Sequence, residues 1–301
     1  MHTPSQFKNA GLLFVSLLLL SCAGPRPATQ IQEKHFLWEA AGPAGTVFLL
    51  GSIHVAKKEL YPLPDVIEGA FAQADTLVVE INPLDSQSPQ GQMALAQRGV
   101  YPAGTSLRAQ VSAETYEKTR MYLAERDLGV DLFDRFRPWF VALTLTMAEA
   151  QRLGFDPRNG IDIHFLGRAA GRKRILELET FEQQIALFEG LSEREQELYL
   201  VYTLEDMKLI SSQMDRLMRA WTEGDAASVE ALLKEGLAGR PDAGAMYDRW
   251  VDRRNDKMAE KIEGYLKTGG NYFVVVGAGH LIGERGLIRI LEAKGHAVRQ
   301  L

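Results

Sequence analysis

Two stretches of the sequence share one pattern, an apolar run that ends in Gly-x-x-His. They occupy residues 46–54 (TVFLLGSIH) and residues 272–280 (YFVVVGAGH). Apolar runs rich in β-branched and aromatic residues are typical of buried strands. Each run is followed by a helical pattern and a further short strand. We therefore expect one strand–GxxH–helix–strand unit near each end of the chain.

Strands that alternate with helices form a parallel or mixed sheet, and α/β folds bind ligands at the edge where strand ends meet. If both units share one sheet, His54 and His280 lie at the same edge. A further strand is expected at residues 76–81, and Glu80 lies near its end. A buried strand seldom carries an unpaired carboxylate. Glu80 therefore either belongs to a site or lies in solvent on an edge strand.

Two histidines and a glutamate at one edge suit a divalent metal ion such as Mn²⁺, Co²⁺ or Zn²⁺. An open position on that ion would activate water, with Glu80 as a ligand or as the general base. The other interpretation is that His54 and His280 only cap turns through hydrogen bonds. The spacing leaves both interpretations open.

Five other polar residues are candidates for supporting roles. Arg254 lies on the helix expected just before the second GxxH run, where it could act as an electrostatic clamp on developing negative charge. The other four would orient the ligands: Ser52, Asp162, Glu179 and Asn255. Each of them, taken singly, could equally be a solvated surface residue.

The middle of the chain is mostly helical in pattern, and we treat residues of about 106–266 as a helical insertion. Ser112 is the expected N-cap of one helix, with Gly129 as its C-cap residue. A capping-box pattern begins at Ser192 and opens a long helix that is expected to reach Trp221.

Composition and motifs exclude several classes of function. The net charge of −5 gives no reason to expect nucleic acid or an anionic membrane surface as a partner. The chain has no G-x-S-x-G elbow, P-loop, H-E-x-x-H or C-x-x-C motif. Three further histidines are not expected to bind a ligand: His35 and His296 should be solvated, and His164 should be packed or exposed.

The N-terminal segment is expected to be an export signal rather than part of the fold. Lys8 precedes a short apolar run at residues 11–20, which is too short to span a bilayer comfortably. The following sequence up to Cys22 resembles the lipobox of bacterial lipoproteins, where the signal is cut and the thiol is acylated. Cys22 is the only cysteine, so it cannot form an internal disulfide. A plain secretory signal is the alternative.

These patterns divide the chain into a lipoprotein signal peptide at residues 1–21, a flexible tether at residues 22–34 and a domain at residues 35–301. Similarity to other lipoproteins implies that Ala23 directs the protein to the outer membrane, facing the periplasm. Membrane attachment would then come from the lipid on Cys22.

An ordered set of short motifs across the mature chain resembles the TraB/GumN (TraB/PrgY/GumN) family, which includes the TIKI metalloproteases. The matching segments are residues 49–54, 77–80, 160–162, 178–180 with Gln183, 254–255 and 276–281. The resemblance implies a central mixed β-sheet related to the erythromycin-esterase and ChaN-like proteins. It also implies that His54, His280 and Glu80 form a metal-dependent protease site.

From this resemblance we expect a metal-dependent hydrolase that acts on a peptide or a small molecule. Arg254 would stabilise the oxyanion. Two other functions stay open. Resemblance to ChaN-like proteins suggests a protein that binds haem or another metal ligand, and resemblance to pheromone-regulating members suggests one that sequesters a peptide without cleaving it.

Overall fold

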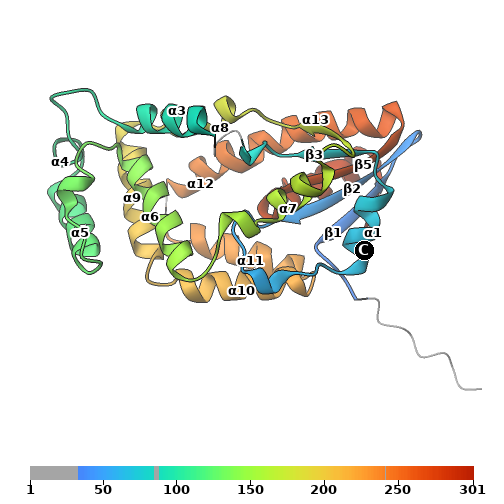
Figure 1. Ribbon diagram of the computed structural model, residues 1–301, viewed down its shortest axis with the longest axis horizontal. Coiled ribbons are helices and arrows are strands. Elements are labelled where there is room, and N and C mark those ends of the chain that lie inside the picture. The colour runs from blue at the N-terminus through green and yellow to red at the C-terminus, as the bar shows by residue number, and fades with distance from the viewer. Residues whose placement is uncertain (1–32, 85–87, 241) are drawn as a thin grey trace, which may run out of the picture. The chain divides into compact units, whose positions relative to one another are not determined.

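A mixed six-stranded β-sheet lies at the centre of the computed structural model, which describes residues 33–84, 88–240 and 242–301. The strand order is β4-β3-β5-β2-β1-β6, and Figure 1 shows helices around the sheet. The strands are β1 (Leu37–Ala41), β2 (Gly45–Ser52), β3 (Thr76–Val79), β4 (Arg174–Glu177), β5 (Gly270–Gly277) and β6 (Ala297–Gln300). The α/β class with a mixed sheet is thus confirmed. The finer likeness to ChaN-like proteins stays a prediction.

The two strands that carry the GxxH runs, β2 and β5, are parallel neighbours in the middle of the sheet. Their register pairs Leu49 with Val274 and Ser52 with Gly277. Both strands are apolar and buried because helices cover the two faces of the sheet. Because the two strands are paired in this register, their carboxyl ends lie at the same level of the sheet.

Helices cover both faces of the sheet. On one face, Phe273 of β5 contacts Phe71 of α1 (Asp65–Gln73) and Phe165 of α7 (Ile161–Ala169), with ring centroids 5.4 and 4.8 Å apart. The neighbouring Tyr272 stacks on Tyr265 of α13 (Arg253–Thr268). Successive side chains of a strand point to opposite faces, so α13 covers the face opposite α1 and α7.

The middle of the chain adds a helical group with its own apolar core. That core contains Val141 and Leu145 of α6, Leu200 and Leu204 of α9, and Leu107. Figure 1 shows α5, α6 and α9 together at one end, away from the sheet. The helices of this segment are α3 (Pro89–Gly99), α4 (Leu107–Gln110), α5 (Ala113–Ala124), α6 (Pro138–Arg152), α8 (Phe181–Glu189), α9 (Glu193–Asp206), α10 (Ile210–Thr222), α11 (Ala226–Leu237) and α12 (Ala243–Tyr247). Helices α14 (Ala278–Leu281) and α15 (Leu287–Ala293) lie between β5 and β6.

The helix expected from Ser192 to Trp221 is in fact two helices. Ser192 does form its capping box, but α9 ends at Asp206 and α10 begins at Ile210. The reason is that α9 buries Leu200 in the helical core whereas α10 buries Trp221 against the sheet core. The chain must turn between the two cores, and no glycine or proline marks that turn.

Two smaller predictions are also wrong. Gly129 does not end the helix capped by Ser112, because α5 stops at Ala124 and Asp127 takes the left-handed conformation with φ of 57°. His296 is not solvated: its side chain is 12% exposed and lies 4.0 Å from Glu263. His164 is packed as expected, since its ring stacks on Tyr61.

The predicted signal peptide, Cys22 and the tether up to residue 32 lie outside the described residues. Within the described part of the chain, no helix has both the length and the apolar character needed to span a bilayer.

Candidate active site

His54, Glu80 and His280 converge on a space above Gly277. A Cβ atom on Gly277 would lie 3.3 Å from Nε2 of His54, 3.4 Å from Oε2 of Glu80 and 3.6 Å from Cδ2 of His280. The backbone of Gly277, with φ of −49°, is one that any residue can adopt. The glycine is therefore needed for the space it leaves, not for its conformation. We call this space the Gly277 cradle.

His54 is held by a carboxylate on its far side. Its Nδ1 lies 2.9 Å from Oδ2 of Asp162, and Oδ1 of Asp162 accepts a hydrogen bond of 3.0 Å from the Ser52 hydroxyl. The negative charge of Asp162 raises the pKa of His54 to about 9, although burial acts in the opposite direction. The side chain of His54 is nevertheless 62% exposed, so the ring is accessible to a ligand.

His280 is held in the same way by an amide. Its Nδ1 lies 2.6 Å from Oδ1 of Asn255, whose Nδ2 donates a hydrogen bond of 2.8 Å to the Arg285 carbonyl. Because a carbonyl can only accept, the amide nitrogen must face Arg285 and the amide oxygen must face the ring. His280 therefore carries a proton on Nδ1. In the neutral ring, Nε2 has a lone pair, and it lies 3.7 Å from Oε1 of Glu80.

Glu80 is a buried carboxylate in a central position. It follows β3, which lies between β4 and β5, and it is 5% exposed. The interpretation of a solvated edge-strand glutamate is therefore wrong. Its Oε2 accepts from the Gly277 N–H at 2.9 Å, and its Oε1 accepts from Arg254. Burial alone would raise the pKa of Glu80, but the positive charges of His280, His54 and Arg254 outweigh it and hold that pKa well below its usual value.

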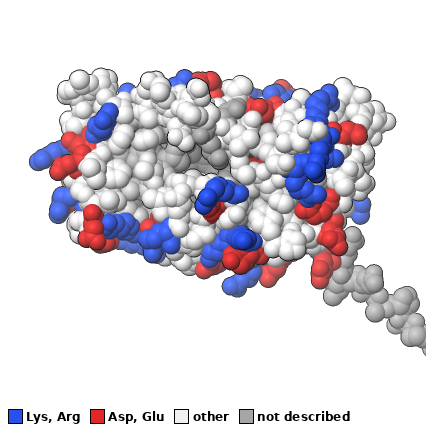
Figure 2. Space-filling view, in the orientation of Figure 1, with Lys and Arg blue, Asp and Glu red and all other residues white. Residues whose placement is uncertain are grey.

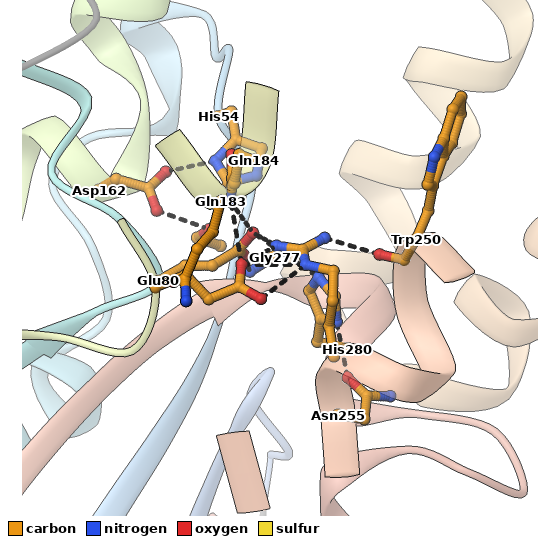
Figure 3. A network of polar contacts seen from close by, with 12 residues as sticks. His54, Glu80, Asp162, Gln183, Gln184, Trp250, Asn255, Gly277 and His280 are labelled. Carbon is orange, nitrogen blue, oxygen red and sulfur yellow. Dashed lines mark hydrogen bonds and ion pairs between the residues drawn. The ribbon is translucent and has the colours of Figure 1, made fainter. Parts of the chain in front are cut away.

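Arg254 joins Glu80 to a second buried carboxylate, Glu179. Its Nε lies 2.9 and 3.0 Å from the two Glu179 oxygens, and its Nη2 donates to both Glu179 and Glu80. Its Nη1 donates to the Trp250 carbonyl at 2.6 Å. Every nitrogen of the guanidinium thus has a protein acceptor, which favours a role in positioning Glu80 over direct contact with an oxyanion. Figure 3 shows this network together with His54, Asp162, His280 and Asn255.

The sequence motif pointed to Gln183, but the neighbouring Gln184 is the residue that reaches the site. Gln183 closes the capping box of α8 with Thr180. Gln184 donates from Nε2 to Oε1 of Glu80 at 2.8 Å, and that nitrogen lies 3.4 Å from Oε2 of Glu179. The capping-box pattern could have revealed that Gln183 does not reach the site. In such a box the side chain at the third helical position, here Gln183, folds back onto the helix start.

A cavity of about 410 Å³ opens beside these residues. Its lining includes His54, Glu80, Asp162 and Gln184. Figure 2 shows that the face in view is hollowed near its centre and that few charged groups surround the hollow. A cavity of this size next to converging polar groups is the usual form of a small-molecule or substrate site.

The donor set fits a divalent metal ion. Each imidazole has Nδ1 held by an oxygen, as is typical of metal-binding histidines. His54 directs Nε2 toward the Gly277 cradle, whereas His280 meets the cradle with Cδ2 and has its Nε2 3.7 Å from Oε1 of Glu80. Among residues 33–84, 88–240 and 242–301, however, no three His, Cys, Asp or Glu side chains are grouped as a ready-made ion site. The oxygens of Glu80 already accept hydrogen bonds from the protein.

The similarity to known proteins extends over nearly the whole of the described chain. The sequence profile of the TraB/PrgY/gumN family matches residues 36–300. YbaP, an uncharacterized protein of Escherichia coli (strain K12), is 27% identical over 266 residues, which cover 87% of this chain and 95% of YbaP. A metalloprotease TIKI homolog of Amphimedon queenslandica is 23% identical over 345 residues, covering 96% of this chain and 66% of that protein. No solved structure matches.

Proposed function

The chain belongs to the TraB/PrgY/gumN family, and we propose that it is a metal-dependent hydrolase anchored in the bacterial envelope. The observation that carries the proposal is the convergence of His54, Glu80 and His280 on the Gly277 cradle. The similarity to a protein named as a metalloprotease TIKI homolog favours hydrolysis, with a peptide bond as the first bond to test.

The two histidines would hold the ion through their Nε2 atoms. A divalent ion in the cradle would supply Lewis-acid polarisation of the scissile group and lower the pKa of a water molecule. Asp162 and Asn255 fix the two rings from behind, so the Nε2 atoms need little reorganisation to bind. Preorganised ligands of this kind raise both metal affinity and the precision of substrate placement.

Glu80 would contribute negative charge rather than take up protons. Its pKa lies well below the usual value, so it is ionised at neutral pH and is a poor proton acceptor there. It would bind the ion or hold water by a hydrogen bond, and the general-base role becomes the less favoured one. Arg254 and Gln184 keep its carboxylate in place.

The envelope location rests on the N-terminal sequence. The apolar run at residues 11–20 and the lipobox-like sequence before Cys22 support export and lipid attachment. We propose that the acylated Cys22 holds the domain at the outer membrane on its periplasmic side, where proteins and peptides in transit would be its substrates. Labelling with a radioactive fatty acid, in the intact chain and in Cys22→Ser, tests this part separately.

The test of the hydrolase proposal is metal content. Residues 35–301, purified and dialysed with divalent ions, should hold roughly one Mn²⁺, Co²⁺ or Zn²⁺ per chain, as measured by elemental analysis and calorimetry. His54→Ala and His280→Ala should each lose it. His296→Ala is the control, because its nearest charged partner is Glu263 and it takes no part in the cradle.

A chain that binds no ion at about 100 µM, far above the dissociation constants of built metal sites, would overturn the proposal. If His54→Ala and His280→Ala bind metal as well as the parent does, the cradle is not the metal site. A Soret band on haem titration, or a stable peptide complex without cleavage, would then favour the two binding functions.

A further inference from the structure

We propose that the cavity beside His54 binds an apolar side chain of the substrate, next to the bond that is cleaved, and that Met147 and Ile163 set this preference. The inference rests on the proposed function and names the substrate class for the same site. It starts from the mixed lining of the 410 Å³ cavity, in which the polar residues of the site are joined by mostly apolar ones.

The rest of the cavity lining is mostly apolar. It includes Val55 after β2, Ile81 after β3, Met147 of α6 and Ile163 of α7, together with Pro83 and Pro157. Because His54 and Glu80 line the same cavity, an apolar side chain bound here would lie beside the cradle. The cradle itself would still have room for water. Removal of apolar surface from water would supply the binding energy.

Met147 is unusual within its own helix. The inner face of α6 buries Val141 and Leu145 in the helical core, whereas Met147 is 36% exposed and faces the cavity. Its side chain adds apolar surface to the cavity lining, and an apolar ligand bound there would remove that surface from water. Methionine is flexible and polarizable, so it adapts to apolar groups of different shape.

The charges around the cavity exclude a lysine or arginine side chain as the occupant. Glu80 and Asp162 are already bonded to Arg254, Gln184, His54 and Ser52, and Arg158 is bonded to Asp156. A lysine or arginine of the substrate would therefore lose its hydration without gaining an unpaired counter-charge from these cavity residues.

The same arrangement explains what the helical middle contributes. The polar groups of the cradle come from the sheet edge, at β2, β3 and β5, whereas Met147 and Ile163 come from α6 and α7. Substitutions in α6 can therefore change the preferred side chain without touching the residues of the cradle. We assign substrate selection to α6 and α7, and chemistry to the strand ends.

The experiment measures binding and cleavage with one peptide series. Fluorescein-labelled Gly-Gly-X-Gly-Gly peptides with X = Leu, Phe, Ala, Asp or Lys are titrated by anisotropy into His54→Ala, in which cleavage cannot interfere, and are assayed for cleavage with the parent chain. Leu and Phe peptides should bind at least roughly tenfold more tightly than Asp and Lys peptides, because pockets of this kind discriminate by about 10–200-fold per apolar group.

Met147→Glu should abolish the preference for Leu and Phe in both assays, and Met147→Leu should retain it. Met121→Glu is the matched control, because Met121 is also an exposed methionine but lies on α5, outside this cavity. Selective binding without cleavage of any peptide would uphold the inference and count against the hydrolase. Cleavage without preference, indifference to Met147→Glu, or no binding of any peptide would overturn the inference.

Discussion

Asn255 determines the orientation of the His280 ring, because its side-chain amide is bonded on both sides. Its Oδ1 lies 2.6 Å from Nδ1 of His280 and its Nδ2 donates to the Arg285 carbonyl at 2.8 Å, with Asn255 fully buried. Neither bond can be exchanged for one to water without opening the packing around α13. The amide therefore connects the first turn of α13 to the second GxxH motif. It also determines which edge of the His280 ring faces Glu80.

Asn255→Ala should leave the His280 Nδ1–H and the Arg285 carbonyl unpaired. We expect the free energy of unfolding to fall by about 1–3 kcal/mol, the cost of leaving buried polar groups unsatisfied. Metal affinity should fall by roughly 10–100-fold, as when a group behind a ligand is lost. Urea unfolding and calorimetry measure the two effects. Asn271→Ala, which removes an exposed bond to Gln73, is the control and should change neither.

Gly277→Ala should fill the cradle while leaving the fold intact. The added Cβ would lie 3.3 Å from Nε2 of His54 and 3.4 Å from Oε2 of Glu80, so these groups must shift by a few tenths of an ångström and the ion loses its space. We expect metal binding to be lost with a cooperative thermal transition retained. Gly279→Ala is matched, because its Cβ would meet only Leu233 at 3.5 Å. If the two variants bound metal equally, the cradle would not be the ion site.

The placement of the strands and of His54, Glu80 and His280 could be predicted because it follows from local pattern and parallel topology. Two apolar runs of the same period, each followed by a helix and a further strand, leave little freedom for the ends of β2 and β5. The distances among Ser52, Asp162 and Asn255 could not be predicted, since they depend on how α7 and α13 pack against the sheet.

The helical middle was less predictable for a physical reason. The break between α9 and α10 is imposed by burial in two separate cores, not by glycine or proline. Helix α3 did carry a local signal, since Ser88 accepts from the Gly91 N–H and Pro89 occupies the first turn. Gln184 was missed because the motif marked its neighbour, whose side chain serves the helix cap.

Arg254→Met should destabilise the protein strongly. Its side chain is 13% exposed, and its removal leaves the buried carboxylate of Glu179 without its ion-pair partner and takes one of the positive charges away from Glu80. Breaking such a pair from one side costs about 3–5 kcal/mol. Arg253→Met is the neighbouring control: that side chain is 67% exposed and bonds Asp248, so its loss should cost less than about 1 kcal/mol. Equal urea midpoints for the two variants would contradict the role given to Arg254.

The pH dependence of the metal-free protein should report the His54–Asp162 pair. Asp162 raises the pKa of His54 from 6.5 to about 9, so the pair contributes stability that is fully present below pH 6.5 and is lost as the pH rises through about 9. In Asp162→Asn the pKa should return toward 6.5, and this part of the pH dependence should disappear. Metal binds the neutral ring, so affinity in the parent should increase with pH up to about 9.

Proton NMR of the imidazole rings measures this shift, and His164 on the same helix as Asp162 is an internal reference. Burial lowers the pKa of His164, so its resonance should titrate below 6.5 in both the parent and Asp162→Asn. A His54 resonance that titrates near 6.5 in the parent would show that Asp162 does not hold the ring in its charged form. The account of how His54 is oriented toward the cradle would then have to rest on packing alone.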